Sequence, residues 1–549
     1  MIITPGATTD GSMLITHSDD NELSDQRLIF VPAQDHPPGS LRGVVNGTVD
    51  SYPRLVSKER GPGYNTPTWP ETPLIGKIPQ AAHTYAYFDG SYGIMNEHNL
   101  MLGECTNGAK FMPDPVSQEE AKKTGKHCRI FYSAELSRIA LERCRTAREA
   151  VALIGALIDE YGYFSTGETL LVGDEKEAWV VEMCALPDEE YHSAWIAQRV
   201  PDGTVFVAAN QFRIRDIKPD DPNQIFSDRL LPGLKKVGWA TGTGPWDWLV
   251  AVSDGEYNHP YYSLRRVWRV FDRVNPDLGL SPWVNDGGYS RDYPFSIKPK
   301  SKLKCNDVFS LYRDHYEDTQ FDMTKGIAAG PYGDPTRVYG SYDGASYDIS
   351  SHHLYGAWER PISVYYQGYT YVCQTRADAP DLTKGLCWFA PDIAFTSCFI
   401  PFPAKVNQLP QAFQTGDPQK FSRKAAWWAF DFVANWARLN FQRMVQVDIQ
   451  PRQQNLEALA SKRIQEWDEK AVTGCTRTKL TELAETHANA VLKNWWDLAD
   501  LLVAKYSDGY INPQPSRPQN PLPVGVGYPS TWLGQTNYAT GPISYAMRM

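Results

Sequence analysis

Short strand-like runs separated by turn residues dominate the chain up to about residue 403. Val, Tyr, Thr and Leu fill these runs, and clusters of Gly, Asp or Pro bound most of them, as is typical of β-strands. Helices are expected only at Ala134–Ile158, Leu264–Val274 and Cys305–Tyr316. This mixture predicts an α+β fold with antiparallel sheets rather than a doubly wound parallel sheet. The expected strands are Met13–Thr16, Tyr85–Phe88, Thr169–Gly173, Ala178–Met183, Val205–Ala209 and Tyr369–Gln374.

After about Pro403, large aromatic side chains recur at helical spacing. Phe421–Val447 and Leu483–Tyr506 both carry an apolar stripe, and the more polar Pro451–Lys470 lies between them. Such stripes are typical of helix faces that pack on a core. We therefore expect a core of residues 1–403, a helical extension of residues 404–511 packed on it, and an irregular Pro-, Gly- and Tyr-rich tail from 512 to 549.

The overall charge excludes some classes of partner. A net charge of −10 argues against nucleic acid or an anionic membrane as the main partner, because both require a basic surface. No apolar run approaches the ~20 residues of a membrane span. The opening residues MIITPG contain no signal peptide, so the sequence predicts a soluble protein, cytoplasmic or secreted, without deciding between the two compartments.

No motif indicates a metal site. The nine cysteines include no C-x-x-C pair, so a zinc ribbon or thioredoxin-type site is not expected. His352 and His353 are adjacent and would point apart on a strand or a helix, which makes them a poor pair of metal ligands. We predict neither a metal nor an organic cofactor.

The informative motifs are dispersed along the chain and individually unusual. They are Asp10–Asp20 (DGSMLITHSDD), Gly93–His98, Leu102–Thr106, Gly167–Leu170, Glu177–Glu182, Trp195–Gly203, Ala209–Ile214, Tyr262–Trp268 (YSLRRVW), Arg313–Lys325, Gly368–Arg376 and Phe399–Phe402. At these residues the chain resembles the C69 (also called U34) dipeptidases. These are cysteine N-terminal-nucleophile (Ntn) hydrolases related to secernins and, more distantly, to penicillin V acylases and bile salt hydrolases.

The resemblance implies a four-layer αββα sandwich, in which helices cover two antiparallel sheets, with a helical C-terminal extension. It also implies hydrolysis of dipeptides that have a free amino terminus, through a thioester and without a cofactor. Small peptides are then the expected partners. The long tail could reach a neighbouring subunit, which leaves a homo-oligomer open.

One departure from the family concerns the nucleophile. Members open their mature chain with a cysteine whose own α-amine serves as the base. Read back from Ala7–Ser12, that cysteine would lie about three residues before Met1, whose thioether is a poor nucleophile. Three explanations stay open. The native protein carries the cysteine upstream, or the chain is a non-catalytic relative with a binding or assembly role, or another residue such as Thr4 or Cys105 substitutes.

The resemblance also assigns roles to residues that would surround the nucleophile. Asp20 and His17 match the Asp and Arg that hold the nucleophile's amine and thiolate in the acylases, with His17 in place of Arg. Asn210 matches the asparagine whose amide stabilises the oxyanion. The alternatives are a turn-forming Asp20 and an Asn210 that caps a strand end.

Four further residues are candidates for the surroundings of the nucleophile. Arg265 or Arg266 matches an arginine near the nucleophile, and because the two are adjacent on an expected helix, one of them must point elsewhere. Glu104 could bind a substrate ammonium group, or it could be a structural carboxylate. Cys105 falls at the position of the second oxyanion-hole residue.

Overall fold

The computed structural model describes residues 1–21, 25–46, 53–66, 68–188, 190, 192–256, 261–337, 359–514 and 522–538. His352 and His353, which the sequence argues against as metal ligands, lie outside the described residues.

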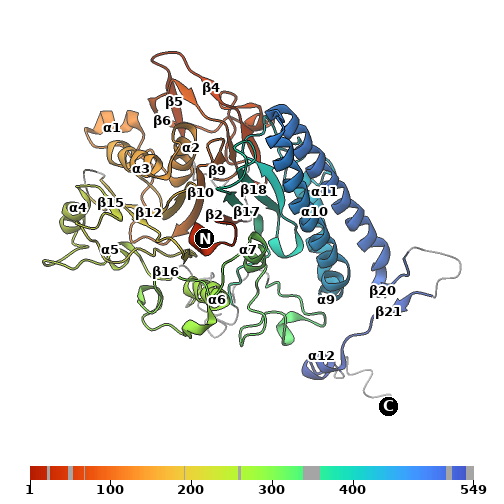
Figure 1. The fold of residues 1–549 in the computed structure, drawn as a ribbon. Helices are drawn as coiled ribbons and strands as arrows, with labels where there is room; N and C mark the ends of the chain where they lie inside the picture. The colour runs from red at the N-terminus through yellow and green to blue at the C-terminus, as the bar shows by residue number, and fades with distance from the viewer. Residues whose placement is uncertain are drawn as a thin grey trace.

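Two large antiparallel sheets form the centre of the protein (Figure 1). The first has the order β16 (Ser296–Ile297), β14 (Val205–Phe206), β1 (Ile2–Ile3), β2 (Met13–Asp20), β17 (Gln367–Thr375), β18 (Gly385–Pro391) and β19 (Ile400–Pro403). The second has the order β15 (Gln224–Phe226), β13 (Ser193–Arg199), β12 (Ala178–Ala185), β11 (Gly167–Gly173), β10 (Met101–Asn107), β9 (Gly93–Asn96), β8 (Tyr87–Asp89) and β3 (Ile29–Val31). The predicted α+β fold with two antiparallel sheets is confirmed.

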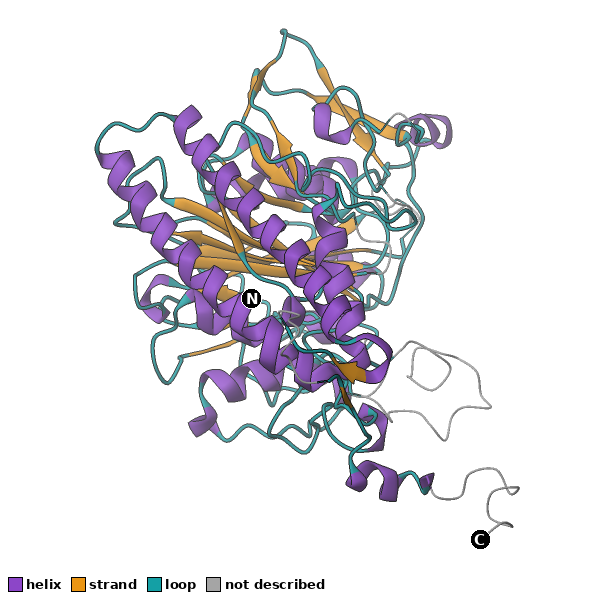
Figure 2. Cartoon of the chain, turned by 90° about the vertical axis from the view of Figure 1, so that its right-hand side faces the viewer, coloured by secondary structure: helices purple, strands orange, loops and turns teal. Residues whose placement is uncertain are grey.

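Helices cover the outer faces of both sheets (Figure 2). On the eight-stranded sheet lie α2 (Ser133–Arg143) and α3 (Ala147–Tyr161). On the seven-stranded sheet lie α7 (Cys305–Tyr312), α8 (Ala426–Ala437), α10 (Gln450–Val472) and α11 (Arg477–Lys505). The order of layers is therefore helix, sheet, sheet, helix, and helices from the 404–511 segment supply much of the fourth layer.

Side chains that alternate along the strands fill two apolar cores. On β11, Leu171 faces the other sheet and packs in the same core as Ile15 of β2. Its neighbours Leu170 and Val172 face the opposite way and pack with residues of α2 and α3. Because the strand period is two, a strand segment buried on both faces is apolar at consecutive positions, as Leu170, Leu171 and Val172 are here.

The smaller elements surround this sandwich. They are β4 (Gln34–Asp35), β5 (Leu41–Val45), β6 (Leu74–Pro79), β7 (His83–Thr84), α1 (Gln118–Thr124), α4 (Leu230–Lys236), α5 (Trp248–Val252), α6 (Leu264–Val274) and α9 (Phe441–Met444).

The helix expected at Ala134–Ile158 is in fact two helices. α2 ends at Arg143, and Thr146 begins α3 with a capping box in which its side chain accepts from the Glu149 N–H. A Thr-x-x-Glu pattern satisfies N–H groups at a helix start, which favours a new helix over a continuous one. The strand expected at Val205–Ala209 ends at Phe206, whereas α6 has the predicted bounds.

The segment after Asn512, expected to be irregular, contains two short elements. β21 (Val524–Gly525) pairs with β20 (Tyr510–Ile511), and α12 (Ser530–Gln535) follows. Both lie away from the sandwich, at the lower right of Figure 1. Among the helices in the described ranges, none combines the length and apolar character that a bilayer span requires.

Candidate active site

A cavity of about 220 Å³ opens at the end of β1. β1 lies between β2 and β14 in the seven-stranded sheet, and the N-terminus lies in the middle of the molecule (Figure 1). The backbone pairing of β1 with β2 extends to Met1 at the cavity, because the Thr16 N–H donates to the Met1 carbonyl at 3.0 Å. The lining includes Met1, His17, Asp19, Asp20, Arg54, Tyr92, Glu104, Cys105, Asn210, Arg266, Tyr312 and Arg360.

Six of the seven candidate site residues line this one cavity. They come from β2, β10, the segment after β14 and α6, which are far apart in the sequence. Arg265 is the exception. The six are His17, Asp20, Glu104, Cys105, Asn210 and Arg266.

Asp20 presents one carboxylate oxygen to an arginine and keeps the other for the cavity. Its Oδ2 accepts from the Arg360 guanidinium at 2.8 Å. Its Oδ1 is buried and has no hydrogen-bond donor among the described residues. A buried carboxylate oxygen without a donor is costly unless a ligand or another group supplies one. Asp20 is therefore arranged to receive a cationic or N–H donor.

Asn210 joins β10 to the start of α6 through four hydrogen bonds. Its backbone N–H donates to the Cys105 Sγ at 2.9 Å and its Nδ2 to the Thr106 carbonyl at 2.8 Å. Its Oδ1 accepts from Arg266 at 2.8 Å, and its carbonyl from the Ser263 hydroxyl at 2.9 Å. An amide nitrogen has two hydrogens, so one Nδ2–H stays available for an oxyanion.

The Asn210 backbone is left-handed, with φ at +53°. Asn adopts this conformation more readily than most residues, because its short polar side chain forms local hydrogen bonds. Such backbone outliers cluster at functional sites.

The two adjacent arginines of α6 point in different directions. Arg266 lines the cavity and donates to Asn210. The Arg265 guanidinium instead stacks on aromatic rings, 3.8 Å from the Phe321 centroid and 4.5 Å from that of Trp283. It also lies 3.7 Å from Glu359. Arg265 therefore stabilises the packing behind α6, and Arg266 is the arginine of the site.

The His17 side chain packs between the two sheets. Its Nδ1 lies 2.9 Å from the Glu104 carbonyl and 3.1 Å from the Glu104 N–H, and its ring stacks on Tyr371 with centroids 5.4 Å apart. Its buried Nε2 has no protein partner among the residues described. The ring is held in one orientation, with one nitrogen available to a ligand or to water.

The two alternative nucleophiles are poorly placed. Burial and the nearby Glu104 raise the pKa of the Cys105 thiol to about 12, so almost none of it is thiolate at neutral pH. Thr4 lies beyond β1 on the side away from the cavity. Its hydroxyl donates to the Thr204 carbonyl at 3.0 Å, and it does not line the site.

A buried glutamate holds the segment that follows Asn210. Glu182 of β12 accepts from the backbone N–H groups of Arg213 and Ile214 at 2.6 and 3.2 Å, and from the Trp248 indole at 2.8 Å. All three donors lose their acceptor if this carboxylate is removed, which leaves them buried and unsatisfied.

Glu182→Leu is expected to destabilise the fold by about 3 kcal/mol or more, because each unsatisfied buried donor costs about 1–3 kcal/mol. Equilibrium unfolding in urea measures this. Glu175→Leu is the matched control, because that side chain is 40% exposed and its ion pair with Lys384 lies at the surface. Equal stability of the two variants would contradict a supporting role for Glu182.

The sequence did not point to three other lining residues. Arg360 pairs with Asp20, the Tyr312 hydroxyl hydrogen-bonds Thr16 at 2.6 Å, and the Arg54 guanidinium lies over the Tyr92 ring at 5.8 Å. Arg54 and Arg360 lie outside the described helices and strands, where no periodicity indicates the direction of a side chain. Tyr312 lies at the end of α7. This helix was predicted, but its orientation relative to the cavity was not.

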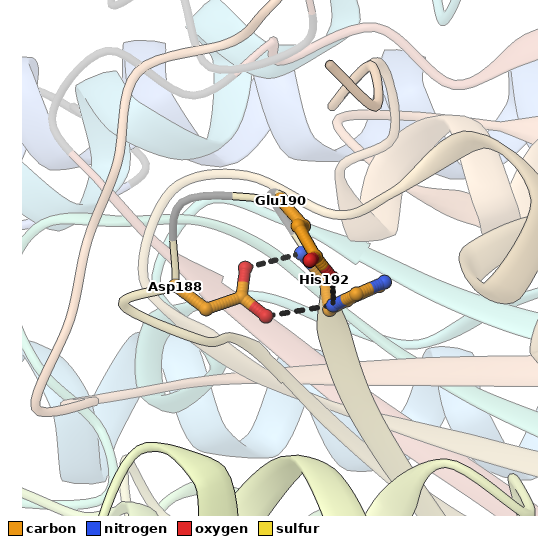
Figure 3. Close-up of side chains that lie close together, drawn as sticks. All are labelled: Asp188, Glu190 and His192. Carbon is orange, nitrogen blue, oxygen red and sulfur yellow. Dashed lines mark hydrogen bonds and ion pairs between the residues drawn. The ribbon is translucent and has the colours of Figure 1, made fainter.

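Asp188, Glu190 and His192 form a separate cluster of possible metal ligands (Figure 3). The His192 Nδ1 lies 2.7 Å from Asp188, and the Lys236 ammonium lies 3.0 Å from Glu190. The lysine already supplies a cation to these carboxylates. The cluster is therefore explained by protein ion pairs.

Comparison with known proteins agrees with this geometry. The family model described as peptidase family C69 matches residues 1–454. The chain belongs to peptidase family C69. The match covers both sheets and the cavity, so the resemblance carried by the dispersed motifs is confirmed.

Several curated relatives are similar to this chain over most of their length. A probable dipeptidase of Latilactobacillus sakei is 23% identical over 452 residues, which are 82% of each chain. A probable dipeptidase of Salmonella dublin is 27% identical and covers 75% of this chain and 81% of its own. Dipeptidase A of Lactobacillus helveticus is 22% identical, with 79% and 81% covered.

Proposed function

We propose that this cavity is the acyl-transfer site of a dipeptidase and that a cysteine preceding Met1 on the line of β1 is its nucleophile. The names of the relatives support dipeptides as substrates. The observation that carries the proposal is the register of β1.

β1 pairs with both of its neighbours in a defined register. Ile2 lies opposite Ile15 on β2 and opposite Phe206 on β14. Each step backwards along β1 is one step forwards on each antiparallel partner. A strand continued by three residues before Met1 would place its first residue opposite Asp19 of β2, and Asn210 is at the matching position in the segment that follows β14. This is the spacing that the family's cysteine requires.

The side chain at that position would also face inward. Opposite residues of an antiparallel pair share a face, and alternate residues of a strand share a face. The third residue before Met1 is thus on the same face as Ile2 and Ile15, which pack between the sheets. Its α-amine would lie at the level of Asp20, the next residue along β2.

The proposed reaction follows from these positions. The cysteine sulfur attacks the peptide carbonyl carbon while the α-amine accepts the thiol proton. The oxyanion is stabilised by the remaining Asn210 Nδ2–H. The C–N bond then breaks, the α-ammonium returns the proton to the departing amino group, and a thioester remains. Water attacks the thioester, the C–S bond breaks, and the first amino acid leaves as a carboxylate.

The direct test adds the nucleophile. In the Cys-extended chain, Cys-Thr-Thr precedes Met1 and an initiator methionine is removed before the cysteine. We expect it to hydrolyse Ala-Ala and to accumulate a mass-detectable acyl-enzyme. The matched Ala-extended chain, with Ala-Thr-Thr, should do neither. Absence of hydrolysis by a folded Cys-extended chain would refute catalysis and leave a binding role.

Cys105→Ala in the Cys-extended chain is expected to retain at least about a tenth of kcat, because a thiol this buried is no nucleophile. The substitution removes the acceptor of the Asn210 N–H, a contact worth about 1 kcal/mol, and the long contact of the thiol with the Asn107 Oδ1. Steady-state hydrolysis of Ala-Ala measures the effect. Loss of all activity, with the fold intact by circular dichroism, would make Cys105 the reactive thiol instead.

A further inference from the structure

Two buried glutamates lie side by side on neighbouring strands at one end of the cavity. Glu104 is on β10 and Glu168 on β11, where Thr106 is directly opposite Glu168. Strand alternation puts Glu104, Thr106 and Glu168 on one face of the sheet. The Thr106 hydroxyl lies 2.8 Å from Glu104 and 3.2 Å from Glu168, so it bridges the two carboxyl groups.

Thr106 holds the two carboxyl groups close together, and burial raises the pKa of both, which favours a proton on at least one of them. The Glu168 Oε1 also accepts from the Tyr132 hydroxyl. The Glu168 Oε2 is buried and has no donor within the described part of the chain. Like charges this close cannot both form at low cost.

Only one member of the pair lines the cavity. Glu104 does so between His17 and Cys105, whereas Glu168 lies behind it and is fully buried. Glu104 precedes Cys105 on β10, so the two side chains leave the strand on opposite faces, and Glu104 meets the cavity on the side of His17, whose Nδ1 is 3.7 Å away. The carbonyl of a substrate is expected at the Cys105–Asn210 hydrogen bond. In a peptide with a free N-terminus, the ammonium group is one carbon removed from that carbonyl.

The other charged and titratable groups around the pair are few. The nearest is His17, whose Nδ1 is 3.7 Å from Glu104. The tyrosines are neutral donors, because burial raises their pKa values well above the usual range. Arg54 lies against Tyr92 and near Asp19. The set is His17, Arg54, Asp19, Tyr92, Cys105, Tyr132 and Tyr163. The Met1 α-amine, whose pKa burial lowers to about 5, lines the same cavity.

We propose that the Glu104–Glu168 pair binds the α-ammonium group of the substrate and makes the site selective for peptides with a free N-terminus. This inference rests on the proposed function for the identity of the ligand. Glu104 makes the contact. Glu168 is a positioning residue that stores the proton and holds Glu104 through Thr106.

The pair couples binding to proton release. Burial raises the pKa of Glu168 to about 7, and burial together with Glu168 raises that of Glu104 well above its usual range. The raised pKa values favour protonated carboxyl groups at pH 6, so a cation binds with loss of a proton. Affinity for an ammonium ligand should rise between pH 5.5 and about 7 as the pair ionises. The ligand's own amine stays charged over this range.

Isothermal titration calorimetry tests the inference on the chain that begins at Met1, because it measures binding and requires no turnover. The probes are Ala-Ala and N-acetyl-Ala-Ala at pH 6, in two buffers of different ionisation enthalpy. We expect Ala-Ala to bind at least about tenfold more tightly and to release close to one proton, as for a buried charge pair. Glu104→Gln should abolish both the preference and the release.

The Glu168→Gln variant distinguishes proton release by the glutamate pair from proton release by His17. With one carboxyl group left, the pKa of Glu104 falls, so Ala-Ala should still be preferred but with much less proton release at pH 6. Unchanged release would assign the proton to His17 and overturn the shared-proton pair. A folded Glu104→Gln variant that keeps the preference for Ala-Ala overturns the inference outright.

The outcome is distinguishable from that of the proposed function. Selective ammonium binding with an inactive Cys-extended chain would support the ammonium site and refute catalysis. An active Cys-extended chain that cleaves Ala-Ala and N-acetyl-Ala-Ala equally well would support catalysis and refute the ammonium site.

Discussion

Asp20→Ala in the Cys-extended chain is expected to lower kcat for Ala-Ala by about 10³-fold or more, with the fold retained. Asp20 has one oxygen fixed by Arg360 and the other directed to the cavity without a donor among the residues described. Without this carboxylate the α-amine that serves as base is no longer positioned, and residues that act as a unit lose most of the rate together.

Steady-state kinetics with Ala-Ala measures this loss, and thermal unfolding reports the fold. Asp277→Asn is the matched control, because Asp277 is 65% exposed and pairs with Lys300 far from the site lining. A folded Asp20→Ala variant with kcat within about threefold of the parent would remove Asp20 from the mechanism.

Asn210→Gly is expected to lower kcat by about 10²–10³-fold, the usual effect of removing one oxyanion donor. Glycine is the informative replacement, because the backbone φ of +53° is accessible to it without strain. The substitution removes the Nδ2–H and also the Oδ1 that accepts from Arg266. KM should change far less than kcat if the amide acts on the transition state.

Asn99→Gly provides the control for backbone effects. Asn99 is also left-handed, with φ at +66°, but it lies in the turn between β9 and β10 and does not line the cavity. Equal losses of kcat in the two variants would attribute the Asn210 effect to chain flexibility. A large fall for Asn210→Gly alone supports the oxyanion role.

How accurately the sequence predicted each helix depended on how clearly the helix and its ends are marked by local sequence pattern. α6 was predicted with its observed bounds, because its apolar and charged residues alternate strongly at helical spacing. The break between α2 and α3 was missed, because apolar periodicity continues across it and only Thr146 and Glu149 mark the new start.

The site was partly predictable for a similar reason. Asp20 and Asn210 follow strands within recognisable motifs, and both line the cavity. Arg265 and Arg266 could not be separated from sequence, because the rotation of α6 about its axis depends on the aromatic residues that pack against it. Arg360 and Glu168 act through contacts across the fold that no local pattern specifies.

The central claim is that β1, continued backwards in its present register, brings a cysteine to Asp19 and Asn210. The most direct measurement varies the number of residues between that cysteine and Met1 from one to four and follows Ala-Ala hydrolysis. Two intervening residues, as in Cys-Thr-Thr, should give by far the highest kcat/KM, since one or three would turn the side chain to the opposite face. Equal activity at every spacing, or activity only with one or three intervening residues, would contradict the account.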